Sequence, residues 1–236
     1  MSEPPDEDAA TVRPMNRAAT LAPLKQVQRG YTEGTRRLAA RWIAGLARTR
    51  VSPNALTLGG VLLGAGAAVA VYFENRNHEL FYWLAAALFI VGSILDILDG
   101  ALARESGKAT PFGSFVDSIS DRIGEGFVLG AIGLVFARNG NTVALAFTLA
   151  AIAGSFLVPY ARAKAELLGL RGDVGIGSRA ERVVVISAGL ILAPWGALQW
   201  AIYFLCATAW ITVVHRTLHT RKQLLDSGGM DGFDQR

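Results

Sequence analysis

The chain has 236 residues, of which 52% are hydrophobic and 18% are charged, and its formal net charge is +4. Soluble domains have nearer to a quarter of charged residues, so this composition favours an integral membrane protein over a soluble one. The single cysteine excludes a disulfide framework within the chain. The small positive charge is explained by membrane topology, so we expect no nucleic-acid partner.

The first 50 residues fall into two segments. Residues 1–32 begin with MSEPPDEDAA, which is rich in charge and proline, and we expect a disordered cytoplasmic N-terminus there. In residues 33–50, EGTRRLAARWIAGLARTR, the apolar Leu38, Trp42 and Leu46 recur at helical spacing while arginines occupy other faces. This pattern predicts an amphipathic juxtamembrane helix in the cytoplasmic headgroup layer, with a soluble cap on the helical domain as the alternative.

Six apolar segments approach the roughly 20 residues that a membrane-spanning helix needs. They lie at residues 55–72, 81–98, 112–136, 142–161, 183–195 and 198–214. Backbone groups in lipid need hydrogen bonds within the segment, and no strand-like alternation is present, so the predicted fold class is all-α. We therefore expect a polytopic membrane protein with six transmembrane helices in residues 51–222, followed by a cytoplasmic tail at residues 223–236.

The distribution of basic residues predicts the orientation in the membrane. Of the 23 Lys and Arg residues, Arg76 and Arg138 lie on one side and Arg122 falls within the third segment, which leaves twenty on the other side. The positive-inside rule assigns the basic side to the cytoplasm. Both termini and the loop at residues 100–111 are therefore predicted to be cytoplasmic, with the protein in the cell membrane.

Four aspartates interrupt the second and third apolar segments, within DILDGALARESGKATPFGSFVDSISD at residues 96–121. On helices, Asp96 and Asp99 share one face, and so do Asp117 and Asp121. Four converging carboxylates would repel one another and lose solvation unless something compensated their charge. Oxygen ligands suit hard cations such as Mg²⁺, Mn²⁺ or Ca²⁺, and a pair of ions could share the carboxylates. The pattern predicts a metal site.

Acids inside a membrane also have other uses. They can pair with buried bases, or line a proton or ion path as in an ion-coupled carrier. Arg104 and Arg122 are too few to neutralise the aspartates together with Glu105 and Glu125. Glu125, one turn beyond Asp121, is expected either to orient a metal ligand or to pair with a base. A carrier would favour acids near the membrane midplane, repeated in two halves, and no second copy is present.

Eight positions of the aspartate stretch match a known signature. Asp96-x-x-Asp99-Gly100-x-x-Ala103-Arg104, eight further residues and then Gly113-x-x-x-Asp117-x-x-x-Asp121 resemble the motif of the CDP-alcohol phosphotransferases, the class I CDP-alcohol phosphatidyltransferases. Members of that family transfer a phosphatidyl-type group from a CDP-lipid to an alcohol and release CMP. The resemblance covers residues 34–222 and implies an enzyme of phospholipid biosynthesis with CDP-diacylglycerol as donor, a membrane lipid. It also implies a homodimer.

The resemblance implies a role for each matching residue. The metal ligands would be Asp96, Asp99, Asp117 and Asp121, holding two Mg²⁺ ions, with Mn²⁺ as the other candidate. Asp121 would also be the catalytic general base on the attacking hydroxyl. The residues implied to contact the cytidine nucleotide are Ser52, Pro53, Asn54, Ala55, Gly100, Arg104 and Thr110. A helix start with Ser52 as cap and Pro53 in the first turn explains the first four equally well, and both interpretations can hold together.

Four arginines bear on the acceptor alcohol. Arg162, Arg179, Arg182 and Arg216 lie at cytoplasmic edges of predicted spans, where guanidinium groups suit an acceptor that carries a phosphate. The stretch YARAKAELLGLRGDVGIGSRAERVVV, residues 160–185, resembles the actinobacterial phosphatidylinositol phosphate synthases of this family. The function implied is phosphatidyl transfer to inositol 1-phosphate, giving phosphatidylinositol phosphate. The alternative is a phosphatidylglycerophosphate synthase using glycerol 3-phosphate.

Overall fold

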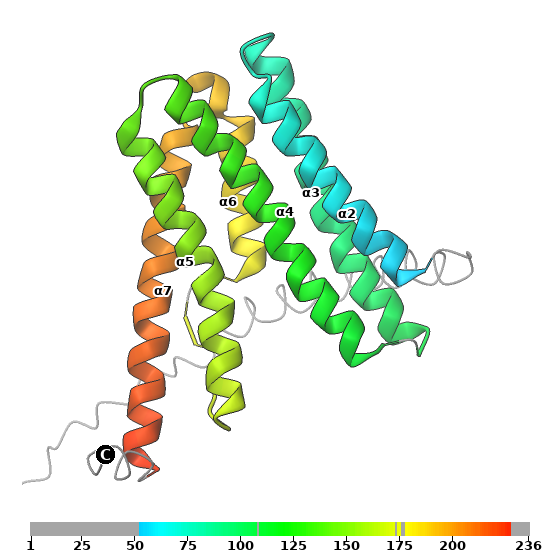
Figure 1. The fold of residues 1–236 in the computed structure, drawn as a ribbon, viewed down its shortest axis with the longest axis vertical. Coiled ribbons are helices and arrows are strands. Elements are labelled where there is room, and N and C mark those ends of the chain that lie inside the picture. Colours follow the sequence, from blue (N-terminus) through cyan, green and yellow to red (C-terminus); the bar gives the residue numbers. More distant parts are fainter. Residues whose placement is uncertain (1–51, 108, 173, 176–177, 228–236) are drawn as a thin grey trace, which may run out of the picture. The chain divides into compact units, whose positions relative to one another are not determined.

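The computed structural model describes residues 52–107, 109–172, 174–175 and 178–227. These residues form six α-helices and one 3-10 turn, and no strand occurs among them, which confirms the predicted all-α fold class. The elements are α2 (Pro53–Tyr72), α3 (His78–Glu105), α4 (Pro111–Arg138), α5 (Thr142–Leu167), α6 (Arg179–Ile191), η1 (Ala193–Trp195) and α7 (Leu198–Asp226) (Figure 1). The predicted N-terminal segment (1–32) and juxtamembrane helix (33–50) lie outside the described residues.

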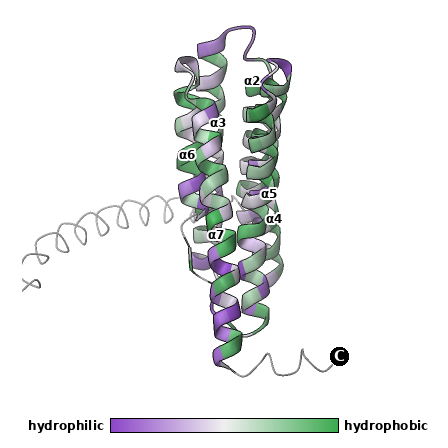
Figure 2. Cartoon of the chain, turned by 90° about the vertical axis from the view of Figure 1, so that its left-hand side faces the viewer, coloured by the Kyte–Doolittle hydropathy of each residue, from purple (hydrophilic) through white to green (hydrophobic). Residues whose placement is uncertain are grey.

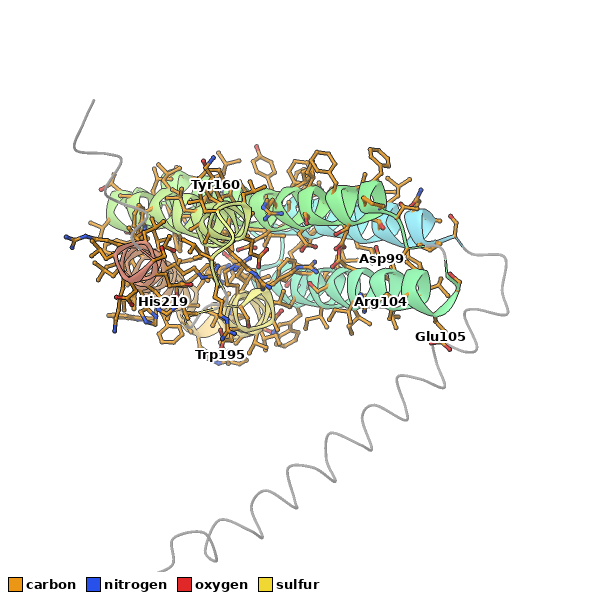
Figure 3. All side chains as sticks on the ribbon, turned by 90° about the horizontal axis from the view of Figure 1, so that it is seen from below. Asp99, Arg104, Glu105, Tyr160, Trp195 and His219 are labelled. Carbon is orange, nitrogen blue, oxygen red and sulfur yellow. The ribbon has the colours of Figure 1, made fainter. Side chains whose placement is uncertain are left out.

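The helices pack in two layers. One layer contains α2, α4 and α5, and the other contains α3, α6 and α7 (Figures 2 and 3). Within the layers, α4 contacts α2 and α5, and α6 contacts α3 and α7. Between the layers, α2 packs against α3 and α5 packs against α7. α4 and α6 are therefore the middle helices of their layers.

Four of the six helices, α2, α3, α5 and α7, are long and apolar enough to cross a membrane. α4 has the length, but it carries five charged residues, and α6 has only 13 residues. The multi-pass character of the chain is thus confirmed, while the membrane crossing of α4 and α6 remains a prediction. The fifth apolar segment, predicted at residues 183–195, is displaced toward the N-terminus: α6 begins at Arg179 and ends at Ile191, and Pro194 lies in the separate turn η1.

The outer surface of the helices is apolar. Large hydrophobic side chains such as Leu62 and Trp200 are more than 60% exposed, whereas Ala67, Ile132 and Leu190 are fully buried. Figure 2 shows hydrophobic residues along most of the bundle and hydrophilic residues toward its ends. An apolar surface this extensive is typical of contact with lipid.

Glycines bring α2 close to α3 and α4. A Cβ atom on Gly60 would lie 3.1 Å from the carbonyl oxygen of Gly92, and one on Gly64 would lie 3.1 Å from the Cα atom of Gly124. Small residues at such points allow helix backbones to approach in a membrane protein. These contacts fix the middle of α2 against the segments of α3 and α4 that carry the aspartates.

Candidate active site and metal centre

Three aspartates converge between α3 and α4. Asp96 and Asp99 share one face of α3, and Asp117 comes from the second turn of α4. One carboxylate oxygen from each lies within 4.8 Å of the other two. Asp96 and Asp99 are buried, with 7% and 2% of their surface exposed. Asp99 points into the space between the layers (Figure 3).

A threonine of α2 completes the surroundings of Asp99. The buried Thr57 hydroxyl donates a hydrogen bond to Asp99 Oδ2. The other oxygen, Asp99 Oδ1, is buried and has no hydrogen-bond partner among the described residues. Burying a carboxylate oxygen without a partner costs free energy, and a cation removes this cost. Three converging carboxylates with an unsatisfied oxygen therefore fit a divalent cation that prefers oxygen ligands.

Asp121 lies one turn beyond Asp117 and outside this group of three. Its Oδ1 atom is 2.7 Å from Nη2 of Arg179, an ion pair without the alignment of a hydrogen bond. The Nη1 group of the same arginine donates to Asp96 Oδ2. One guanidinium of α6 thus joins a carboxylate of α3 to a carboxylate of α4. Metal ligation by Asp121 remains a prediction.

The position at which α6 begins explains how Arg179 reaches the aspartates. α6 begins well inside the bundle, away from the end of α5 (Figure 1). Arg216 of α7 donates to the Val174 carbonyl at 2.8 Å and to the Val158 carbonyl at 2.5 Å. Ser178 then starts α6 with a capping box, in which its hydroxyl accepts from the Glu181 N–H and the Glu181 carboxylate accepts from the Ser178 N–H.

A cavity of about 360 Å³ adjoins the carboxylates. Six of the residues predicted to contact the nucleotide line it, namely Ser52, Pro53, Asn54, Gly100, Arg104 and Thr110, together with Thr57, Asp99 and Asp117. The seventh, Ala55, donates its N–H to the Ser52 hydroxyl, so the predicted helix cap is also present. Thr110 caps α4 in the same way by accepting from the Gly113 N–H at 3.0 Å. Both helix starts therefore face the cavity.

The four arginines predicted to bind the acceptor have different partners. Arg179 contacts the aspartates, and Arg216 holds the carbonyls described above. Arg162 pairs with Glu166 one turn along α5, at 2.8 Å, where both side chains are about half exposed. Arg182 is buried against Glu125, with Nε 2.9 Å from Oε1 and Nη2 2.9 Å from Oε2. The structure thus supports the prediction that Glu125 pairs with a base.

Sequence reasoning missed Thr57 as a neighbour of Asp99. Thr57 and Asn54 are three residues apart, so they share a face of α2 toward the cavity. A hydroxyl residue in an otherwise apolar span, on the same helix face as the predicted site residue Asn54, is a signal that could have indicated Thr57. Its partner could not be deduced, because that contact depends on how α2 is placed against α3.

Comparison with known proteins identifies the family. The family model described as CDP-alcohol phosphatidyltransferase matches residues 50–221. The chain belongs to the CDP-alcohol phosphatidyltransferase family. Its curated relatives include an archaetidylinositol phosphate synthase of Pyrococcus horikoshii, 35% identical over 76% of this chain and 88% of the relative. They also include a phosphatidylinositol phosphate synthase of Mycobacterium marinum, 33% identical over 73% of this chain and 74% of the relative.

Solved structures of the CDP-alcohol phosphatidyltransferase family have the same fold. The phosphatidylinositol phosphate synthase of Mycobacterium tuberculosis with CDP-DAG bound superposes with a TM-score of 0.69 at 27% identity, covering 78% of this chain and 94% of that one. The same protein in complex with manganese and citrate gives a TM-score of 0.68 at 28% identity, with 77% and 88% coverage. The resemblance found in the aspartate motif is confirmed, and the chain is a transferase.

Proposed function

We propose that this enzyme transfers the phosphatidyl group of CDP-diacylglycerol to a hydroxyl of inositol 1-phosphate, giving phosphatidylinositol phosphate and CMP. One observation carries the proposal: the Asp96, Asp99 and Asp117 carboxylates converge beside a 360 Å³ cavity lined by most of the predicted nucleotide-contacting residues. The archaeal and mycobacterial relatives are both named as synthases of an inositol phosphate lipid, but the lipid part of the name differs. The names therefore support inositol phosphate as acceptor more directly than CDP-diacylglycerol as donor.

Asp96, Asp99, Asp117 and Asp121 would hold two Mg²⁺ ions, or Mn²⁺ in their place. Divalent cations bound there would neutralise the charge of the pyrophosphate and stabilise the phosphate of the departing CMP. The manganese in a homologous structure supports a divalent ion of this kind. The three clustered aspartates form one group, and Asp121 lies one turn beyond Asp117 on α4.

The chain's own residues position the reactants and move the proton. Asp121 takes the proton from the acceptor hydroxyl, whose oxygen then attacks the phosphorus that carries the diacylglycerol. The bond from that phosphorus to the CMP oxygen breaks, and CMP leaves with the electron pair. Ser52, Asn54, Arg104 and Thr110 surround the nucleotide in the cavity. The two helix starts there, of α2 and α4, present N–H groups that suit phosphate oxygens.

Arg179 faces the acceptor's phosphate in this proposal, since it is one-third exposed and lies beside the base. Arg162, Arg182 and Arg216, the other arginines predicted to bind the acceptor, would add positive charge on the same side of the membrane. The site faces the cytoplasm with both termini, as the positive-inside rule predicts. We propose that the enzyme works as a homodimer in the cell membrane, by analogy with its family.

The test follows CMP release by the purified protein in detergent with CDP-diacylglycerol and Mg²⁺. Inositol 1-phosphate, glycerol 3-phosphate, free inositol and serine are offered in parallel, with an archaetidyl donor in a second series. Release with inositol 1-phosphate alone is expected. Release with glycerol 3-phosphate instead would retain the reaction type and overturn the acceptor. No metal-dependent release with any acceptor would overturn the proposed reaction.

A further inference from the structure

We infer that Arg179 is an exchangeable counter-ion of the aspartate cluster, which competes with the divalent cation and becomes available to the acceptor's phosphate when the cation binds. The inference rests on the proposed function, because it concerns the cation and the acceptor assigned there. It gives Arg179 a role before cation and substrates bind, in which its guanidinium group neutralises the aspartates, in addition to its role at the acceptor's phosphate.

The contacts of Arg179 place it in direct competition with a cation. Its Nη1 group donates to Asp96 Oδ2, and its Nη2 group lies 2.7 Å from Asp121 Oδ1. Asp96 is also one of the three residues whose oxygens lie within 4.8 Å of one another. The same carboxylate therefore belongs to the arginine contact and to the predicted metal site. A guanidinium beside a divalent cation is repelled, so each weakens the binding of the other.

A second ion pair on the same two helices shows why Arg179 can leave while α6 stays in place. Arg179 and Arg182 lie three residues apart on α6, and they face Asp121 and Glu125, which lie four apart on α4. The Arg182–Glu125 pair is buried, with both side chains 8% exposed and well-formed hydrogen bonds. Arg179 is 32% exposed, and its contact with Asp121 lacks hydrogen-bond alignment. The buried Arg182–Glu125 pair anchors α6, and the partly exposed Arg179–Asp121 pair can be replaced by other partners.

The partial exposure of Arg179 allows this movement. About a third of its side-chain surface, 32%, is exposed. A cavity of about 30 Å³ beside it, lined by residues that include Asp96, Asp121 and Val183, has room for one or two water molecules and not for a guanidinium group. The side chain therefore turns away from Asp96 toward its exposed side, where an anionic phosphate would hold it.

The test measures Mn²⁺ binding to the full chain in detergent, without substrates, from the electron paramagnetic resonance signal of free Mn²⁺. Arg179→Gln removes the competing charge, so the Kd for Mn²⁺ should fall on the order of tenfold. Arg179→Lys keeps the charge but cannot contact two carboxylates at once, so its Kd should lie between those of the wild type and Arg179→Gln. Arg171→Gln is the matched control, because it removes an exposed charge from the neighbouring segment, and its Kd should equal that of the wild type.

A measurement on the wild-type chain covers the case in which Arg179→Gln does not fold. Labelling by phenylglyoxal, followed by mass spectrometry, should modify Arg179 faster when Mn²⁺ is added and more slowly again when inositol 1-phosphate is added as well. Arg182 is the internal reference, and its labelling should not change. Equal Mn²⁺ affinity of wild type and Arg179→Gln, or a labelling rate of Arg179 that does not change with Mn²⁺, would overturn the inference without contradicting the metal site. Absence of Mn²⁺ binding in both proteins would overturn the inference and the metal site together.

Discussion

Arg182 of α6 and Glu125 of α4 form a buried two-pronged ion pair between the layers, with Nε 2.9 Å from Oε1 and Nη2 2.9 Å from Oε2. Removing one partner of a buried pair leaves an uncompensated charge, which typically costs about 3–5 kcal/mol. Glu125→Gln should therefore lower the free energy of unfolding by about this amount. Thermal unfolding of the detergent-solubilised protein, followed by circular dichroism, measures the loss.

The exposed pair between Arg162 and Glu166 is the matched control for this prediction. Both side chains are about half exposed, and their spacing along α5 is one helical turn. Pairs of this kind contribute about 0–1 kcal/mol, so Glu166→Gln should leave the unfolding temperature almost unchanged. Equal losses for Glu125→Gln and Glu166→Gln would contradict the structural role of the buried pair.

Asp121→Asn should reduce turnover by about 10²- to 10⁴-fold, because the amide cannot accept the proton from the attacking hydroxyl. Its effect on Mn²⁺ affinity should be smaller than that of Asp99→Asn, since Asp99 belongs to the converging group of three and Asp121 does not. Steady-state CMP release and Mn²⁺ titration, on both variants, separate the two roles. Near-normal turnover of Asp121→Asn would show that the base is elsewhere.

Thr57→Val should weaken metal binding, although Thr57 is not expected to touch the ion. Its hydroxyl donates to Asp99 Oδ2 and so fixes the carboxylate whose other oxygen has no hydrogen-bond partner within the part of the chain that the structure describes. Loss of such a supporting hydrogen bond typically costs about 10–100-fold in metal affinity or activity. Thr57→Ser keeps the hydroxyl and is the control. If both variants bind Mn²⁺ as the wild type does, the hydrogen bond has no part in holding the ligand.

The contrast between Asp99 and Thr57 illustrates what the sequence could predict. The pairing of Asp96 with Asp99, and their meeting with Asp117, follow from helical spacing and a short connection between two spans. The Thr57 contact depends instead on the register of α2 against α3. That register is fixed where the backbones of Gly60 and Gly92 meet, a long-range contact that no local pattern specifies.

The arginines near α6 show the same limit. Their places at the predicted cytoplasmic edges of spans follow from the sequence, but their partners depend on where α6 begins. Arg216 holds the Val174 carbonyl, and the Ser178 capping box sets the first residue of α6. This start of α6 places Arg179 at the aspartates and Arg182 one turn deeper, at Glu125. The predicted ends of the fifth span were displaced for a related reason, because α6 starts with polar residues that a hydropathy pattern does not include.

At the other end of the bundle, Glu74 is a buried carboxylate with two partners. It is 4% exposed, and its oxygens lie 2.5 Å from Arg138 Nη2 and 2.6 Å from His78 Nδ1. Arg138 also donates to the Tyr72 carbonyl at the end of α2, so this group ties α2, α3 and α4 together. Glu74→Gln should lower the unfolding temperature, because it leaves the Arg138 charge without its carboxylate.

Glu79→Gln is the control for Glu74→Gln, since Glu79 is an exposed acid in the first turn of α3. Both variants should keep the wild-type KM for the acceptor at a temperature where they remain folded, because Glu74 and Glu79 lie at the opposite end of the bundle from Arg179 and the aspartates (Figure 1). Thermal unfolding and acceptor titration on the two variants provide the comparison. A raised acceptor KM in Glu74→Gln with an unchanged unfolding temperature would mean that this cluster acts on the site rather than on stability.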